Sequence, residues 1–372
     1  MDPVSPPGKN WGRWAAAGNA ESRGPITRSP VGARPGILGR VMTKLRQWIN
    51  DDYGLEVTDL TPVDHGADVA AAVWQAQATT GGRYAVKWSG AGTDAGPLTA
   101  AYLASRGVRG VPTPLQTRTG DLWSKREGKR LSLVPWINGG RAAESGLTED
   151  QWSPYGTLLA EVHATAPPAD LCEALPRLSP ISARMPAQLR SVEHRLTTKP
   201  PVDALEDELA TVWWERRGLI TDLLHLAEEL ASKNLGGDQV ICHADPHLGN
   251  VLITAGTGEN NVGAAVEPTD WQLHLIDWDD VILAPREQDL MFMLGGMGSV
   301  GPTTEAQLSA FFTGYGEVNL DADRLTYYRC ARALEDAVGW ADQAIHGPDR
   351  ENCLRILRGV LGPHGLAVRA LS

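Results

Sequence analysis

The chain has little cysteine and no long apolar run, and both absences limit what it can be. It contains 4 cysteines in 372 residues, at positions 172, 242, 330 and 353, and no two of them form a C-x-x-C pair. This spacing supports neither a disulfide framework nor a zinc site, and it fits a reducing compartment. A transmembrane helix needs about 18 or more consecutive apolar residues, and the sequence has no such run. We therefore expect a globular, cytoplasmic protein with no membrane partner.

Positively charged residues are also fewer than negatively charged ones. Lys and Arg total 34 against 45 Asp and Glu, which gives a formal net charge of −11. Proteins that bind nucleic acids or anionic lipids rely on basic patches, so this balance argues against both kinds of partner. The length of the chain favours two domains or two lobes over one core.

Residues 1–41 have no apolar periodicity, neither that of a strand nor that of a helix, and they are rich in Pro, Gly, Arg and Ser. Such a segment buries too little apolar area to offset its ordering entropy, so we predict a disordered extension. It contains no apolar stretch of the kind that a signal peptide needs. Because Met42 opens a helix-like stretch, our hypothesis is that translation starts at Met42.

The rest of the chain divides into a β-rich part and a helical part. Alternation and turn residues predict strands at 69–77, 84–88, 122–124 and 131–134, with a helix at 98–105. Helical spacing then predicts helices at 148–165, 203–232, 303–315 and 321–345, interrupted by short apolar runs in 240–283. The C-terminal end, 350–372, is predicted to be one more helix and a tail. The expected organisation is an N-lobe at 42–135, a hinge at 136–140 and a helical C-lobe at 141–372.

The most informative segment is 240–253, in which two apolar runs flank a polar loop that carries His243, Asp245, His247 and Asn250. A later apolar run ends in Asp277. Phosphoryl transfer from Mg·ATP needs a carboxylate that accepts the substrate hydroxyl proton, and an amide with a carboxylate that hold Mg²⁺. The spacing of Asp245 and Asn250 is that of the H-x-D-x-x-x-x-N catalytic loop of kinases.

Lys87 completes the set, because it follows two apolar residues in a predicted strand, where the lysine of kinases reaches the ATP phosphates. The ordered series predicts a kinase in which Asp245 is catalytic. Lys87, Asn250 and Asp277 would bind ATP, and the last two would hold Mg²⁺. His243 is expected to support the loop structurally.

At these residues the chain resembles the aminoglycoside phosphotransferase family. The family pattern H-G/A-D-x-x-x-x-N followed by I-D-W/F is present at 243–250 and 276–278, and supporting segments fit at 158–163 and 284–290. The resemblance covers 55–345. It implies an α+β, protein-kinase-like fold with two lobes, the cofactors ATP and Mg²⁺, and a small-molecule substrate. Within the family, the chain is most similar to actinomycete spectinomycin phosphotransferases, which implies a cationic aminocyclitol substrate and antibiotic resistance.

A protein substrate is not expected. Pro285 follows Asp277 by only eight positions, and a protein kinase needs room there for an activation loop.

Two features depart from the kinase pattern. The phosphate loop, at 64–68, contains one glycine. The glutamate that usually pairs with the strand lysine is not evident, since Asp94 is the only acid between Lys87 and Gly107. The acidic partner of Lys87 is therefore left open.

Several acids have more than one interpretation. One of Asp279 and Asp280 is expected to contact Mg²⁺ or the substrate, and Asp289 is expected to anchor the catalytic loop. Glu335, Asp336 and Asp342 have spacings that can share a helix face, where they either attract a cationic substrate or form a solvated surface.

Three alternatives to the antibiotic kinase stay open. Cys242, His243, Asp245 and His247 could form a transition-metal cluster. The chain could phosphorylate homoserine, choline, a sugar or another aminoglycoside, or it could bind nucleotide without catalysis. The sequence leaves undetermined the phosphorylated hydroxyl, the choice between ATP and GTP, and the oligomeric state.

Overall fold

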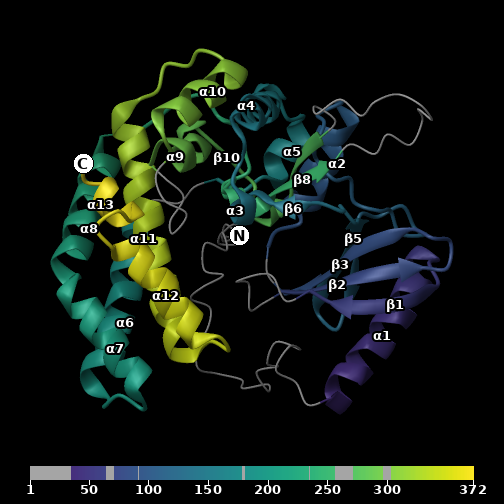
Figure 1. The fold of residues 1–372 in the computed structure, drawn as a ribbon, viewed down its shortest axis with the longest axis horizontal. Helices are drawn as coiled ribbons and strands as arrows, with labels where there is room; N and C mark the ends of the chain where they lie inside the picture. Colours follow the sequence, from purple (N-terminus) through teal and green to yellow (C-terminus); the bar gives the residue numbers. More distant parts are fainter. Residues whose placement is uncertain are drawn as a thin grey trace, which may run out of the picture.

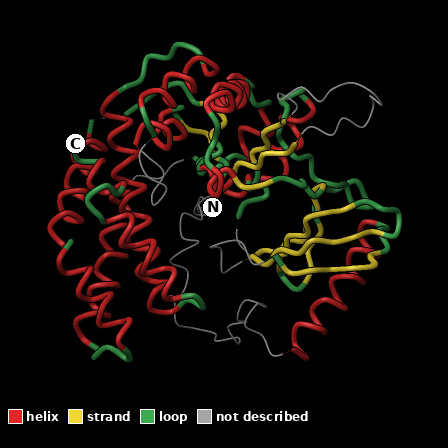
Figure 2. Tube along the Cα trace, viewed as in Figure 1, coloured by secondary structure: helices red, strands yellow, loops and turns green. Residues whose placement is uncertain are grey.

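The computed structural model of the protein (Figure 1) describes residues 35–63, 71–90, 92–177, 181–233, 235–255, 271–295 and 303–372. The expected single-glycine loop at 64–68 and residues 1–34 lie outside the described residues. Strands gather in the N-terminal part and helices dominate the C-terminal part (Figure 2). The expected α+β order is therefore confirmed.

A five-stranded antiparallel sheet forms the N-terminal part, in the order β1-β2-β3-β5-β4. Its strands are β1 (Val57–Pro62), β2 (Ala71–Ala78), β3 (Arg83–Ser89), β4 (Ser124–Arg126) and β5 (Lys129–Pro135). Alternate residues of β2 face the core, where Trp74 and Ala76 are fully buried. This alternation is the period that predicted the strand. Val86 of β3 and Leu131 and Leu133 of β5 complete the same apolar layer.

Helix α1 (Pro35–Tyr53) covers one face of this sheet. Leu45, Ile49 and Tyr53 recur at helical spacing on its buried face, and the Tyr53 hydroxyl donates to the carbonyl of Leu131. The helix begins at Pro35, so residues 35–41 are not part of a disordered extension as predicted. Val41, the last residue of that segment, packs against the apolar layer of the sheet, while Gly39 and Arg40 are exposed.

The helix between β3 and β4, α2 (Ala95–Ser105), belongs to a different core. Its buried residues Ala95, Ala100 and Leu103 pack with the large apolar cluster of the C-terminal part. Helix α2 therefore connects the sheet region to the helical region.

The remaining helices build the C-terminal part, most of them on the left and at the top of Figure 1, with α3 and α5 nearer its centre. They are α3 (Ala142–Ser145), α4 (Glu149–Ala164), α5 (Ala169–Ala174), α6 (Met185–Thr198), α7 (Ala204–Glu215), α8 (Arg217–Ser232), α9 (Glu287–Gly295), α10 (Glu305–Tyr315), α11 (Ala322–His346), α12 (Arg350–Leu361) and α13 (Leu366–Arg369). The helix predicted at 203–232 is two helices, α7 and α8, which are interrupted at Arg216. The C-terminal end, predicted as one helix and a tail, contains α12, and the segment after it includes the short α13.

Two small antiparallel sheets lie within the helical part and carry the polar loops. One pairs β10 (Ile282–Ala284) with β7 (Val240–Cys242), and the other has the order β6-β8-β9. The strands of the second are β6 (Gly140–Arg141), β8 (Val251–Ala255) and β9 (Trp271–Leu275). Within the described part of the chain, three 3-10 turns also occur: η3 (Ile181–Ala183), η4 (Leu248–Asn250) and η5 (Trp278–Asp280).

Helices α4 and α10 pack backbone against backbone. A Cβ atom on Gly156 of α4 would lie 2.0 Å from the carbonyl oxygen of Phe311, and one on Gly314 of α10 would lie 1.7 Å from that of Ser153. Only glycine permits this approach, so these two positions determine how closely the helices pack. None of the described helices combines the length and the apolar character that a membrane span requires.

Candidate active site

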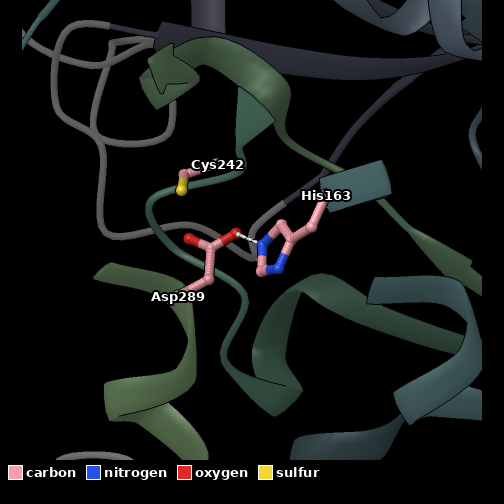
Figure 3. A group of neighbouring side chains, drawn as sticks. All are labelled: His163, Cys242 and Asp289. Atoms are coloured by element: carbon pink, nitrogen blue, oxygen red, sulfur yellow. Dashed lines mark hydrogen bonds and ion pairs between the residues drawn. The ribbon is translucent and has the colours of Figure 1, made fainter. Parts of the chain in front are cut away.

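The loop between β7 and η4 is fixed by a buried carboxylate, Asp289 of α9 (Figure 3). One Asp289 oxygen accepts from the backbone N–H of His243 at 2.8 Å, and the other accepts from that of Ala244 at 2.7 Å. Ala244 has a φ of 68°, a left-handed conformation that is costly for a residue with a Cβ. The two hydrogen bonds hold this strained turn, so Asp289 anchors the loop backbone.

A second layer of contacts supports Asp289 and the loop. The imidazole of His163 on α4 lies with Nε2 3.1 Å from Asp289 and with Nδ1 2.7 Å from the Tyr315 hydroxyl of α10. Tyr155 of α4 donates to the carbonyl of Pro246. The close α4–α10 packing is thereby connected to the polar loop.

His243 joins the loop to the end of β9. Its Nδ1 accepts from the backbone N–H of Asp245 at 3.3 Å, and its Nε2 lies 2.9 Å from the carbonyl of Ile276. Since Nδ1 accepts, the ring proton is on Nε2 and the imidazole is neutral. Burial lowers the pKa of His243, although Asp289 and Asp245 oppose this effect. The ring also makes an edge-to-face contact with Trp278.

The carboxylate of Asp245 has a different partner on each oxygen. Oδ1 accepts from Arg332 of α11 at 2.9 Å, and Oδ2 accepts from the Asn250 side-chain amide at 3.1 Å. His247 also approaches Oδ2, with its Nε2 at 3.3 Å. Burial favours the neutral acid, but the charges of His247 and Arg332 outweigh it and hold the pKa of Asp245 well below its usual range. Asp245 is therefore ionised and oriented.

The orientation of His247 depends on a glycine. The backbone N–H of Gly249 donates to His247 Nδ1 at 2.9 Å, which leaves Nε2 as the protonated nitrogen toward Asp245. A Cβ on Gly249 would lie 2.5 Å from Cε1 of the ring. Burial lowers the pKa of His247, but Asp245 raises it more. Protonation of Nδ1 would give the charged ring that lowers the pKa of Asp245, and it would replace the hydrogen bond that Gly249 donates.

Asn250 and Asp277 offer oxygen atoms that suit Mg²⁺. Nδ2 of Asn250 donates to both the backbone and the side chain of Asp245, so its amide oxygen is the atom that it can offer to a cation. The backbone of Ile276 donates to the carbonyl of Asn250 at 2.9 Å, which holds the loop beside the end of β9. Asp277 follows with a φ of 65°. Such left-handed non-glycine residues are frequent at functional sites, and these two residues fit a magnesium ion.

Lys87 of β3 reaches the same place from the N-terminal sheet. Its Nζ lies 2.8 Å from Oδ1 of Asp277 and 2.7 Å from Oδ2 of Asp279. Asp279 also accepts from Arg130 of β5. The structure thus places Asp279 beside Lys87, whereas the sequence suggested a contact with the substrate or with Mg²⁺.

Two acids of α11, Glu335 and Asp336, are held by arginines. Asp336 accepts from Nε of Arg332 at 2.8 Å, so this guanidinium bridges Asp336 and Asp245. Arg332 also lies over the Phe292 ring, 5.1 Å from its centroid. Glu335 accepts from Arg184 at 2.6 Å. Burial raises the pKa of Glu335 to about 7, against the effect of the two arginines.

Asp342 lies two helical turns further along α11 and pairs with the exposed His346. The structure therefore connects Asp336 to Asp245 through Arg332, and separates Asp342 from this network.

The transition-metal alternative does not match the contacts of its residues. Cys242 contacts the carbonyls of Ala284 and Pro285, and both nitrogens of His243 are engaged by the backbone. Among the described residues, His163, Cys242 and Asp289 do lie close enough to share an ion (Figure 3). The hydrogen bonds of Asp289 and His163 already explain why these side chains lie close together, without a metal ion.

Sequence reasoning missed the arginines of the site. Arg332 could have been found, because it precedes Asp336 by one helical turn, a spacing at which opposite charges pair. Arg130 and Arg184 carry no such local signal.

Comparison with known proteins agrees with this geometry. The profile described as Phosphotransferase enzyme family matches residues 60–334. Spectinomycin phosphotransferase APH(9)-Ia, in a crystal structure with ADP and spectinomycin, is 25% identical, with a TM-score of 0.75 over 89% of this chain and 97% of that chain. No curated protein matches the sequence significantly.

More distant structures share the fold. A microcompartment-associated aminopropanol kinase is 16% identical, with a TM-score of 0.59 over 88% of this chain and 95% of that chain. An amicoumacin kinase is 15% identical, with a TM-score of 0.53 over 90% and 99%. Kinases of this family use ATP and act on small molecules. The chain belongs to the phosphotransferase enzyme family and is a small-molecule kinase with an α+β, kinase-like fold.

Proposed function

We propose that the protein transfers the γ-phosphoryl group of Mg·ATP to a hydroxyl of a cationic aminocyclitol or aminoglycoside antibiotic, and thereby confers resistance. Spectinomycin is the preferred acceptor. The observation that carries the proposal is the placement of the α11 acid Asp336 next to Asp245 through Arg332. The likeness to a spectinomycin phosphotransferase supports the choice of acceptor.

The nucleotide would bind between an N-lobe at 42–135 and a C-lobe at 141–372, with adenine against the backbone of the hinge at 136–140. Lys87 would hold the α- and β-phosphates. Asn250 and Asp277 would hold Mg²⁺, which neutralises charge on the phosphates when it is bound. These residues supply positioning and charge, which dominate catalysis of phosphoryl transfer.

Asp245 would accept a hydrogen bond from the acceptor hydroxyl and orient it toward the γ-phosphate. Its contacts favour this role, because Asn250 and His247 hold one oxygen and Arg332 takes a single position on the other. A carboxylate oxygen has two lone pairs, so Oδ1 can accept from a hydroxyl as well. Asp336 would attract an ammonium group of the acceptor, and Glu335, whose pKa is raised to about 7, would add negative charge above that pH.

A coupled ADP-release assay with Mg²⁺ tests the proposal, on spectinomycin beside kanamycin, streptomycin, hygromycin, homoserine and choline. We expect spectinomycin-dependent turnover. The matched control is Asp245→Asn, which keeps the shape of the side chain and should lose roughly 10²–10⁴-fold in turnover while nucleotide still binds. Near-normal turnover of that variant would refute the role of Asp245.

The panel separates the alternatives. Turnover on another acceptor alone would leave the roles of Asp245 and Asp277 intact and discard spectinomycin as the acceptor. Nucleotide binding without turnover on any acceptor would favour a binding module over an enzyme.

A further inference from the structure

Lys87 contacts two carboxylates that follow β9, and only one of them is proposed to hold metal. Asp277, at 2.8 Å, would carry Mg²⁺ when nucleotide is bound. The second carboxylate, Asp279, forms a close ion pair with Lys87 at 2.7 Å. Its side chain is only 9% exposed, so water screens this pair much less than a surface pair. Asp279 can therefore keep Lys87 in place after Asp277 has bound a cation.

Arg130 fixes Asp279 from its other side. In the register of β3 and β5, Lys87 lies opposite Ser132 and Ser89 lies opposite Arg130. Lys87 and Arg130 are therefore on the same face of the sheet. Arg130 donates to Oδ1 of Asp279 and to the backbone carbonyl of Thr93. One buried carboxylate thus receives a cation on each oxygen, which sets its orientation.

Helix α2 offers no acid for this purpose. Its residues, Ala95–Ser105, include neither Asp nor Glu. At its first turn, a Cβ on Gly96 would lie 2.8 Å from the carbonyl oxygen of Trp278, the residue before Asp279. The helix backbone therefore contacts η5 directly, and η5 itself carries an acid to Lys87.

We propose that Asp279, held by Arg130, is the positioning residue for Lys87. It would act in place of the acid that protein kinases carry on the helix after the lysine strand. The inference rests on the proposed function, since it takes Lys87 as the nucleotide lysine. It assigns Asp279 to the nucleotide side of the site and not to the acceptor.

Calorimetry with Mg²⁺ and a non-hydrolysable ATP analogue tests this assignment without any acceptor. Asp279→Asn removes the charge and should weaken nucleotide binding by roughly tenfold or more, the scale of a lost charged hydrogen bond. Asp279→Glu should recover part of the affinity. The matched control is Asp94→Asn. Asp94 is the N-cap residue of α2, is exposed and makes no side-chain capping hydrogen bond, and it is the other acid in this region that could pair with Lys87. Its nucleotide affinity should stay unchanged.

A double-variant cycle shows whether Asp279 acts through Lys87. The pair Lys87→Met with Asp279→Asn should lose little more affinity than Lys87→Met alone. Additive losses would overturn the inference, as would a loss in Asp94→Asn with none in Asp279→Asn. Arg130→Met provides a second variant, checked by thermal unfolding, if Asp279→Asn does not fold.

The outcomes distinguish this inference from the function on which it rests. If the natural chain binds no nucleotide, both fail. If it binds nucleotide and Asp279→Asn binds equally well but needs more acceptor for half-maximal rate, only the positioning role fails, and Asp279 contacts the acceptor.

Discussion

Arg332 donates a hydrogen bond to Asp245 across 2.9 Å, and the same guanidinium holds Asp336. A cation of the protein therefore lies between the proposed catalytic carboxylate and the proposed acceptor site. Two carboxylates and the ring of Phe292 surround it. These are the groups that also bind ammonium ligands, so Arg332 lies where a cationic acceptor would have to approach.

Replacement of Arg332 should strengthen binding of a cationic acceptor. Arg332→Gln removes one positive charge near Asp245 and Asp336, so KM for the acceptor should fall several-fold, for about 1 kcal/mol of relieved repulsion. We expect kcat to fall as well, because one restraint on Asp245 is lost. Steady-state kinetics with varied acceptor measure both values. Arg332→Lys, which keeps the charge, should leave KM close to that of the natural enzyme. A raised KM in Arg332→Gln would mean instead that Arg332 binds the acceptor.

Gly249 should matter through the ring of His247. Gly249→Ala places a Cβ against Cε1 of His247, so the ring must move away from Asp245. We expect a turnover loss of roughly tenfold, the scale of one lost hydrogen bond to a charged group, with little change in nucleotide affinity.

The control for Gly249→Ala is the same substitution in a His247→Gln background. If the glycine acts through the ring, Gly249→Ala should cause little further loss of turnover in the His247→Gln background. An equal loss in both backgrounds would show that Gly249 has a separate role.

Magnesium should lose its effect on nucleotide binding when Asp277 is replaced. The natural chain should bind an ATP analogue more tightly with Mg²⁺ than with a chelator, because Asp277 and Asn250 supply oxygen ligands. Asp277→Ala should bind it with similar affinity in both conditions. Asp245→Asn serves as the control and should keep the magnesium dependence. Calorimetry in the two buffers measures the nucleotide affinities. If magnesium strengthened binding to Asp277→Ala as much as to the natural chain, Asp277 would not be a magnesium ligand.

Glu335 should make stability depend on pH. Its pKa is raised from 4.5 to about 7 in the folded protein, chiefly by burial. Between these values the folded state binds more protons than the unfolded state, so the free energy of unfolding falls as the pH rises through this window. Glu335→Gln removes this contribution. Denaturant unfolding across this pH range should therefore show that the free energy of unfolding of the variant increases relative to that of the natural protein as the pH rises. If the free energies of unfolding of the two proteins changed with pH in parallel, the result would contradict the shifted pKa of Glu335.

Gly314 should be intolerant of any side chain. Gly314→Ala places a Cβ 1.7 Å from the carbonyl oxygen of Ser153, and the helices must separate. Overpacking typically costs about 1–3 kcal/mol, and turnover should fall too, because α4 and α10 carry His163 and Tyr315, which support Asp289. The matched control is Gly218→Ala in α8, where nothing lies within 4 Å of the added Cβ. Thermal unfolding should show a lower Tm for Gly314→Ala only.

The parts of the site that the sequence predicted are those encoded locally. Asp245 and Asn250 share one short loop, so their spacing already brings them together. The acids of α11 follow from helical spacing in the same way. The fold class was likewise accessible, because alternation in β2 and helical periodicity in α11 each reflect one buried face.

What the sequence could not supply depends on contacts between distant segments. The pairing of Lys87 with Asp279 and Arg130 requires the register of β3 with β5 and the position of η5, and neither is visible in any local pattern. The helix before Met42 has no local signal either, because the contact of Val41 with the sheet joins segments that are distant in the sequence.

The position of Asp279 bears on regulation. Protein kinases are commonly switched by movement of the helix that carries the partner of the lysine. Here that acid is on η5, two residues from Asp277 and in contact with Arg130 of the sheet. It cannot be withdrawn without displacing Asp277 as well. Because α2 itself carries no acid, a movement of its side chains alone would leave the contact between Lys87 and Asp279 in place.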